Sequence, residues 1–169
     1  MQRPPEVSAL LAGLFAFLAA GTALLAALAG QYIFDLYPCV LCHYQRWALL
    51  GAMIAGLAAA LLWNRLTQAR LAAGLAALAF AASAAIAFFH VGVEAAWWRG
   101  LEGCSAPDFG GGMSREEIKA AILSAPVVAC DEVPFRFLGL SMAGWNLVFS
   151  AAAAVIVPMI LLSRKGATR

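Results

Sequence analysis

The residues best suited to chemistry in this sequence are four cysteines, Cys39, Cys42, Cys104 and Cys130. The first two form a Cys-x-x-Cys motif, which is typical of thiol–disulfide exchange. Disulfides persist outside the cytosol, so the side of a membrane on which these residues lie would matter. With His43, the same stretch also reads Cys-x-x-Cys-His, the attachment signature of c-type haem. Two hypotheses follow, a redox dithiol and a covalent haem site.

Composition indicates what kind of protein positions these cysteines. The chain has 169 residues, of which 64% are hydrophobic and 12% are charged. Soluble domains are about half apolar and a quarter charged, so the sequence predicts an integral membrane protein. The formal net charge of +2 and the lack of a basic run give no reason to expect a nucleic-acid partner.

Four apolar segments are long enough to cross a bilayer, which takes about 20 residues in a helix. They cover residues 7–30, 42–62, 71–93 and 142–162. The first is longer than the apolar region of a signal peptide, which favours a retained helix. We therefore expect an all-α membrane protein, a four-helix transmembrane bundle forming one domain over residues 1–169. The predicted outer loops are residues 31–41 and 94–141.

Positive charge in short loops predicts the orientation, because lysine and arginine favour the cytoplasmic side. One face collects Arg65 and Arg70 with the basic residues of both ends, Arg3, Arg164, Lys165 and Arg169. This places both termini in the cytoplasm and all four cysteines on the opposite, oxidising side. The cysteines did not enter the charge count, so their placement supports the prediction independently.

The long outer loop contains a second helical pattern. Ser114 and Glu117 have the spacing of a capping box, in which each side chain satisfies a backbone N–H of the other. Apolar residues then recur on one helical face. We expect a short amphipathic helix over residues 115–124, with a membrane-surface position or packing against the protein as alternatives.

Two pairs of residues could tune the chemistry. Cys42 and Arg46 are four positions apart and can share a helical face. The positive helix N-terminus and Arg46 would both favour the thiolate form of Cys42. His90 and Glu94 have the same spacing at the outer end of the third segment. They either line a pocket for an electron acceptor or form an ordinary polar helix end.

Other hypotheses compete with a thiol relay. A haem on Cys39, Cys42 and His43 would have to fit a very short loop and would leave Cys104 and Cys130 without a shared purpose. Zinc on all four cysteines would need closer spacing in the second pair, so we expect no metal site. Cys104 and Cys130 could also form a purely structural disulfide in a protein that is not an enzyme.

The sequence resembles the DsbB family of membrane disulfide bond formation proteins over nearly its whole length. The resemblance rests on Pro38-Cys39-Val40-Leu41-Cys42 with Arg46, on the Cys104/Cys130 pair, and on Phe137-Leu138-Gly139-Leu140-Ser141-Met142 before the last helix. The segment His90-Val91-Gly92-Val93-Glu94 looks like a family variant. A vitamin K epoxide reductase-like protein has related chemistry but a different helix count and motif placement.

The resemblance implies a protein-dithiol:quinone oxidoreductase in the bacterial inner membrane. Such an enzyme reoxidises a periplasmic DsbA-like thiol oxidase and passes the electrons to ubiquinone or menaquinone. By resemblance, Cys104 captures the partner, Cys130 exchanges with Cys39, and Cys42 faces the quinone. Arg46 maps to the quinone site, with His90 and Glu94 as further candidates for binding this cofactor.

Overall fold

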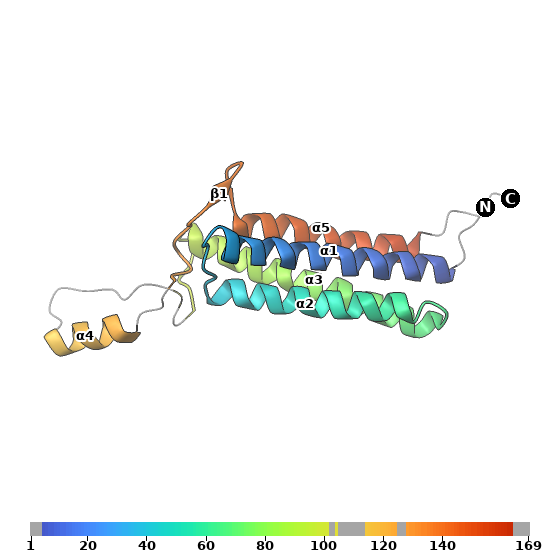
Figure 1. Cartoon of the computed structure of the whole chain (residues 1–169), viewed down its shortest axis with the longest axis horizontal. Helices are drawn as coiled ribbons and strands as arrows, with labels where there is room; N and C mark the ends of the chain where they lie inside the picture. The colour runs from blue at the N-terminus through green and yellow to red at the C-terminus, as the bar shows by residue number, and fades with distance from the viewer. Residues whose placement is uncertain (1–4, 102–103, 105–113, 125–127, 164–169) are drawn as a thin grey trace.

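The computed structural model describes residues 5–101, 104, 114–124 and 128–163 of the chain. Four long helices lie side by side: α1 (Pro5–Ile33), α2 (Val40–Leu61), α3 (Leu66–Glu94) and α5 (Met142–Leu162). α1 begins and α5 ends at the same end of the bundle (Figure 1). The turns after α1 and α3 lie at the other end, where the cysteines gather.

Three helices are long and apolar enough to cross a membrane by length and composition: α1, α3 and α5. α2 packs against α1 and α3, but it is not among these three within the described residues. Its first half carries the polar side chains of Gln45 and Arg46. The three membrane-capable helices agree with the prediction of a helical membrane protein, and a fourth span in α2 remains a prediction.

Two helices extend beyond the predicted membrane spans, which stay predictions. α1 continues through Ile33, past the predicted span of about residues 7–30. α3 begins at Leu66, before the predicted span of about residues 71–93. In both places the apolar pattern fades where the chain would reach water, but Gln, Ala, Leu and Arg still favour helix and the backbone continues. Hydropathy locates the apolar part of a helix and misses its polar ends.

The bundle is held together by small side chains rather than by large ones. A continuous buried cluster joins Ala12, Ala16 and Ala20 of α1 to Ala52 and Ala59 of α2, with further alanines and Phe80 from α3. Such residues let helix backbones approach closely in an apolar environment. The closest approach is at Gly13 and Gly56, where an added Cβ would meet the opposite backbone at 2.5–2.8 Å.

The long outer segment contains two local structures. A helix, α4 (Arg115–Ser124), lies where the sequence predicted one. Its first turn has the predicted capping box: Ser114 N donates to Glu117 at 2.7 Å and Glu117 N donates to Ser114 Oγ at 3.3 Å. Contact of this helix with a membrane stays a prediction.

A short antiparallel hairpin, which the sequence reasoning missed, leads into α5. It pairs β1 (Arg136–Phe137) with β2 (Leu140–Ser141). Leu138 and Gly139 form its turn, with φ values of 50° and 84°. Both central residues of a type I′ turn need positive φ, and this turn suits the twist of a two-residue hairpin. The hairpin delivers Ser141 to the start of α5.

Candidate active site: four thiols beside a polar and aromatic cavity

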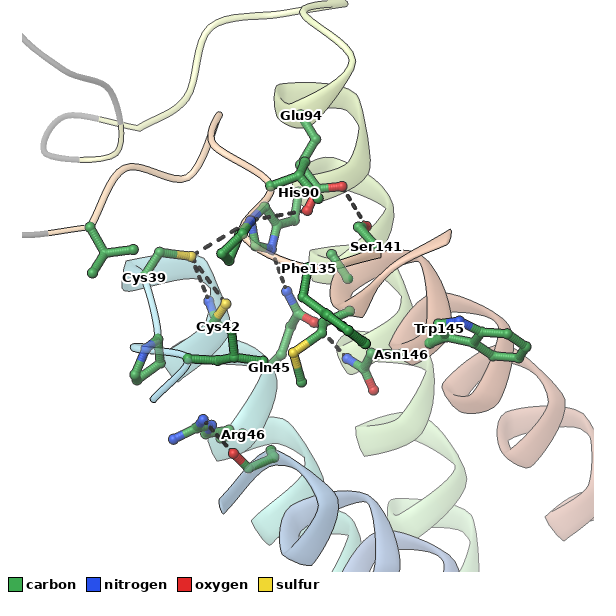
Figure 2. Close-up of a pocket in the computed structure, with 18 of the residues that line it drawn as sticks. Cys39, Cys42, Gln45, Arg46, His90, Glu94, Phe135, Ser141, Trp145 and Asn146 are labelled. Carbon is green, nitrogen blue, oxygen red and sulfur yellow. Dashed lines mark hydrogen bonds and ion pairs between the residues drawn. The ribbon is translucent and has the colours of Figure 1, made fainter. Parts of the chain in front are cut away.

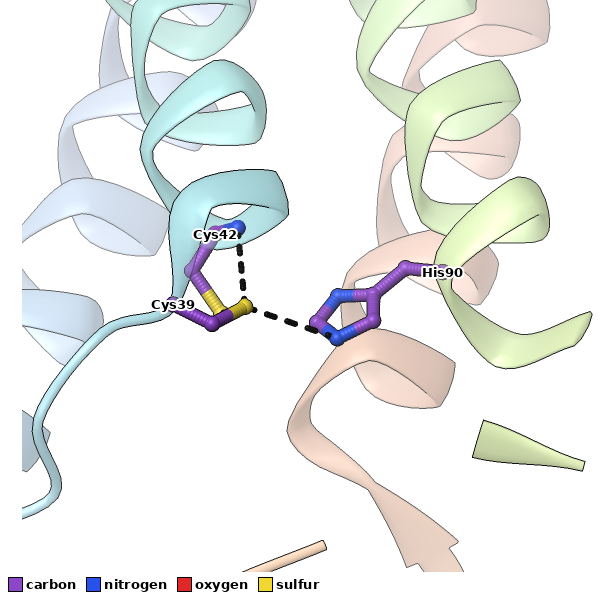
Figure 3. Close-up of side chains that lie close together, drawn as sticks. All are labelled: Cys39, Cys42 and His90. Carbon is purple, nitrogen blue, oxygen red and sulfur yellow. Dashed lines mark hydrogen bonds between the residues drawn. The ribbon is translucent and has the colours of Figure 1, made fainter. Parts of the chain in front are cut away.

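The Cys-x-x-Cys motif forms the N-terminus of α2. Cys39 is the N-cap residue, with extended backbone, and its Sγ accepts a hydrogen bond from the backbone N–H of Cys42 at 3.4 Å. The Cys39 thiol also donates to Cys42 Sγ at 3.1 Å. Figure 3 shows both sulfurs side by side at the first turn. One helical turn therefore suffices to bring this pair into reach of disulfide exchange.

The second cysteine pair lies against the first. The backbone N–H of Cys130 donates to the carbonyl of Cys104 at 2.5 Å. Cys39, Cys104 and Cys130 share one buried cluster with Leu41 and Val93, and Cys42 packs against it. All four cysteines are free thiols in this structure.

The second pair is buried. Cys104 and Cys130 are both 0% exposed. They pack against Leu41 at the start of α2 and Val93 near the end of α3. Access to the Cys104 thiol requires local relief of this burial.

Burial also sets the protonation of the outer thiols. Loss of solvation, reinforced by the hydrogen bond to Cys130, raises the pKa of Cys104 to about 12. Burial raises the pKa of Cys130 as well. The hydrogen bond that Cys39 donates to Cys42, together with burial, raises the pKa of Cys39 to about 12. Cys39 is therefore protonated at neutral pH and supports negative charge on its neighbour.

His90 and Glu94 come together at the outer end of α3, beside the thiols. His90 Nε2 lies 3.6 Å from Cys39 Sγ and 3.8 Å from a carboxylate oxygen of Glu94. The other Glu94 oxygen accepts a hydrogen bond from Ser141 Oγ, at the N-cap of α5. The pair is thus part of the cysteine site, and not merely a polar helix end exposed to water.

A cavity of about 480 Å³ opens beside the thiols and includes Cys42, Arg46, His90 and Glu94 in its wall. Its size falls in the range of small-molecule sites. Apolar and aromatic side chains supply most of the remaining lining, among them Leu36, Phe135, Met142 and Phe149. Figure 2 shows the thiols and Arg46 on one side of this space and Phe135 across it.

Arg46 is held by the end of α1. Its guanidinium donates to Gln31 Oε1 at 2.6 Å and to the carbonyl of Ala27 at 3.0 Å. One acceptor is a side-chain amide oxygen and the other a backbone carbonyl, and both lie near the C-terminal end of α1, which favours a cation. This contact orients the cation beside the cavity, which Cys42 also lines.

The sequence reasoning missed a buried polar group behind the thiols. Gln45 of α2 hydrogen bonds to His90, and Asn146 of α5 hydrogen bonds to Gln45. Ser83 and Ser150 continue the contacts between α3 and α5. The available signal was the occurrence of amide and hydroxyl side chains inside apolar spans, where such groups are functional candidates by default.

The positions of the cysteines and histidines bear on the metal and haem hypotheses. Among the residues that the structure describes, the one group with metal-ligand spacing is Cys39, Cys42 and His90, whose ligand atoms lie within 4.8 Å of one another. The histidine in that group is not the one in the haem-like string. His43 is exposed on the outer surface of α2, and no feature of the site favours a haem.

Comparison with known proteins agrees with the thiol chemistry. The family model described as "Disulfide bond formation protein DsbB" matches residues 9–160. A disulfide bond formation protein B of Shewanella sp. (strain W3-18-1) is 32% identical over 164 residues, covering 90% of this chain and 89% of the relative. One from Shewanella sp. (strain MR-4) is 34% identical over 152 residues, covering 83% and 82%.

A more distant relative has the same description. The disulfide bond formation protein B of Haemophilus influenzae (strain 86-028NP) is 29% identical over 141 residues, covering 82% of this chain and 78% of the relative. These alignments span the motifs at both cysteine pairs. None of these relatives is described as a haem protein, so the haem hypothesis is without support.

Proposed function

This chain belongs to the DsbB family, and we propose that it transfers electrons from a reduced periplasmic DsbA-like thiol oxidase to a membrane quinone. Family membership makes it a membrane oxidoreductase of disulfide bond formation. The finer assignment is supported above all by one observation: two cysteine pairs distant in sequence meet in one cluster at the end of the bundle. A relay of disulfide exchange needs that proximity.

The relay runs through four exchanges, each of which forms one S–S bond and breaks another. A partner thiolate attacks Cys104 of a Cys104–Cys130 disulfide, and the electron pair leaves on Cys130. Cys130 then attacks Cys39 of a Cys39–Cys42 disulfide, and the electron pair leaves on Cys42. When the second partner thiol releases the oxidised partner, Cys104 becomes free to attack Cys130. That attack expels Cys39 and restores the Cys104–Cys130 disulfide.

The cavity beside Cys42 fits a quinone, a flat apolar ring with two polar oxygens. Aromatic and aliphatic side chains would cover the ring, and the cation of Arg46 would face an oxygen that gains negative charge. His90 and Glu94 would supply polar contacts at the thiol end. A bound quinone supplies a two-electron acceptor, and the residues of this chain orient it against the Cys42 sulfur.

The proposal also covers how the chain is oriented in the membrane. We propose one membrane domain of four spans, with α2 as the fourth, in a bacterial inner membrane. Both termini would lie in the cytoplasm and the cysteines would face the periplasm. The turn between α2 and α3 contains Arg65, and Arg70 follows in the second turn of α3. This turn lies at the end of the bundle opposite to the turns after α1 and α3 (Figure 1), which supports this orientation.

Quinone-dependent oxidation of a reduced DsbA-type partner tests the function. The purified full chain in detergent should reduce a ubiquinone or menaquinone analogue, followed by the quinone absorbance. We expect Cys42→Ser to abolish quinone reduction and Cys104→Ser to abolish formation of the mixed disulfide with the partner. His43→Gln, a change at the exposed histidine, should leave turnover unchanged.

Two outcomes would contradict the proposal. One is the absence of turnover with both quinone classes when all four cysteines are intact and a cognate partner is supplied. The other is full activity in Cys42→Ser, which would remove the assigned contact with the quinone.

A further inference from the structure

A chain of hydrogen bonds runs from the thiol site into the core of the bundle. It begins at His90 on α3, continues through Gln45 on α2, and reaches Asn146 on α5. His90 is 4% exposed and Gln45 is 5% exposed. Figure 2 shows the three side chains in sequence, leading away from Cys39. Burying polar side chains is costly unless every donor and acceptor among them is paired. The donor and acceptor of each hydrogen bond in this chain can therefore be inferred from the groups at its two ends.

The outer end of the chain determines which ring nitrogen of His90 carries the proton. Nε2 lies 3.2 Å from the backbone carbonyl oxygen of Cys130. A carbonyl oxygen can only accept a hydrogen bond, so Nε2 must be the donor. In the neutral ring, Nδ1 then has the lone pair and accepts from Gln45 Nε2 at 3.0 Å.

The amide orientations at the inner end of the chain agree with this tautomer. Asn146 Nδ2 donates to Gln45 Oε1 at 2.7 Å, and Asn146 Oδ1 accepts from Ser150 Oγ at 2.9 Å. With its oxygen turned to Asn146, Gln45 must present its NH₂ group to the imidazole. A doubly protonated ring would set an Nδ1–H against that NH₂ group, with two donors face to face. The chain therefore favours neutral His90 with its proton on Nε2.

This tautomer decides what His90 can do to Cys39. Nε2 is also the ring atom nearest to Cys39 Sγ, at 3.6 Å. Since Nε2 carries the proton, it can share this N–H between the Cys130 carbonyl and the Cys39 sulfur, but it cannot take a proton from the thiol. The groups that face the ring from the packed elements are Cys39, Cys130, Glu94 and Gln45. One Glu94 oxygen accepts from Ser141, and the other lies 3.8 Å from Nε2.

We propose that Gln45 and Asn146 are positioning residues that hold His90 as a hydrogen-bond donor to the Cys39 sulfur, assisting its departure when the Cys39–Cys130 disulfide is opened. The inference rests on the relay proposed above. In that step an incoming thiolate bonds to the Cys130 sulfur, the Cys39–Cys130 bond breaks, and the electron pair leaves on Cys39. Cys39 is buried and intrinsically a poor leaving group, so a donor aimed at its sulfur lowers the cost of that charge.

The tautomer can be observed directly. The chain has two histidines, so ¹⁵N-histidine labelling of a His43→Gln protein leaves one imidazole signal in the full chain in detergent. We expect long-range ¹H–¹⁵N correlations to show a neutral ring protonated on Nε2. In Gln45→Glu the carboxylate can only accept, so the ring should gain a proton on Nδ1 and retain the one on Nε2.

The effect on Cys39 is measured without quinone or partner protein. A Cys42→Ser/Cys104→Ser protein retains Cys39 and Cys130, which are oxidised to one disulfide and opened with glutathione. Mass mapping then separates two products: glutathione on Cys130, which reports departure of Cys39, and glutathione on Cys39, which reports departure of Cys130. The ratio of the two products is internal to each molecule, so general loosening of the fold does not imitate the expected change.

Loss of the amide should act on one product only. Gln45→Leu should slow glutathionylation of Cys130 by about tenfold, the size expected for one hydrogen bond to a charged group, with little change at Cys39. Asn146→Leu should also slow glutathionylation of Cys130. This second variant replaces Gln45→Leu as the test if Gln45→Leu does not fold. Gln45→Glu should retain a ratio close to the parent's, because Nε2–H is preserved. Gln68→Leu, the same change at an exposed glutamine of α3, should have no effect.

Two results would overturn the inference: a ring protonated only on Nδ1 in the parent, or product ratios unchanged in both Gln45→Leu and Asn146→Leu. Neither measurement uses quinone or the partner protein, so such a failure would leave the proposed function standing. Failure of quinone-dependent turnover with these two results intact would instead remove the proposed function.

Discussion

At the scale of single residues, Cys39 is where the contacts of the site converge. It caps α2, donates to Cys42, packs in one buried cluster with Cys130 and lies beside Nε2 of His90. With Cys42 and Cys130 both nearby, the Cys39 sulfur can form either a Cys39–Cys42 or a Cys39–Cys130 disulfide without a large movement of the backbone. The burial that permits this also favours protonated thiols at Cys39, Cys104 and Cys130.

The raised thiol pKa values predict how the stability of the reduced protein depends on pH. A group whose pKa is higher in the folded state stabilises the fold below its unfolded pKa and loses that contribution as pH rises toward the folded value. Unfolded thiols ionise near 9.0, whereas the pKa of folded Cys104 is about 12. Stability should therefore fall between about pH 9 and pH 12, by up to about 1.4 kcal/mol per pH unit for each buried thiol.

Unfolding of the protein under reducing conditions at stepped pH measures this dependence. Comparison with Cys104→Ser/Cys130→Ser isolates the two thiols, because all other titrating groups are shared. The variant should show a shallower decline. A parent protein whose stability rises or stays level relative to the variant over this range would contradict the burial of ionisable thiols.

At the scale of helices, the position of the Cys-x-x-Cys depends on how closely α1 approaches α2. Arg46 is anchored to the last turns of α1, and the backbones cross at Gly13 and Gly56 further along. An added Cβ at Gly56 would lie 2.6 Å from the backbone nitrogen of Phe17 and 2.9 Å from Ala16 Cβ. Widening this crossing would shift both helices that line the cavity.

Gly56→Ala should therefore destabilise the bundle by about 1–3 kcal/mol, the usual cost of overpacking a tight interface. Gly74→Ala is the matched control on α3, because an added Cβ there meets nothing within 4 Å. It should be neutral or stabilise by up to about 1 kcal/mol, from the higher helix propensity of alanine. Unfolding by sodium dodecyl sulfate in mixed micelles compares the two, and equal effects would show that the crossing is not tightly packed.

At the scale of the whole molecule, the chemistry is confined to one end of the bundle. The thiols and the cavity wall include residues at the start of α2 and the end of α3. The turns after α1 and α3 and the hairpin before α5 lie at this end of the bundle, and the turn between α2 and α3 lies at the other end (Figure 1). A protein that takes electrons from a periplasmic partner must have its thiol end on the periplasmic side. The charge pattern predicts that the cysteine end faces the periplasm.

Two single cysteine substitutions at exposed positions test this orientation. Arg99 lies near the cysteine end and Asn64 lies in the basic turn, and both side chains are exposed. In intact spheroplasts, a membrane-impermeant maleimide should label Arg99→Cys and should not label Asn64→Cys. Inverted vesicles should give the opposite pattern, with the unsubstituted parent as the background. Labelling of Asn64→Cys from outside would reverse the proposed topology.

Much of this protein was determined by properties that are local in the sequence. Apolar runs of membrane-spanning length reflect hydrophobic burial and backbone hydrogen bonding within each segment. The Cys-x-x-Cys spacing brings Cys39 and Cys42 together within one helical turn. The capping box at Ser114 and Glu117 likewise involves neighbours only. These signals sufficed for the membrane class, the approximate helices, the pocket candidates Arg46 and His90, and the family.

Only the tertiary structure decided which distant residues meet. Cys104 and Cys130 were expected on the oxidising side of the membrane, and their packing against Leu41 of α2 and Val93 of α3 buries them beside Cys39. Gln45 and Asn146 are 101 positions apart, so their hydrogen bond depends on the rotation and depth of two whole helices. No local pattern encodes that geometry, because it follows from how small residues let the helices close together. The chemistry assigned to His90 depends on this packing, since its proton is directed by groups on three separate segments.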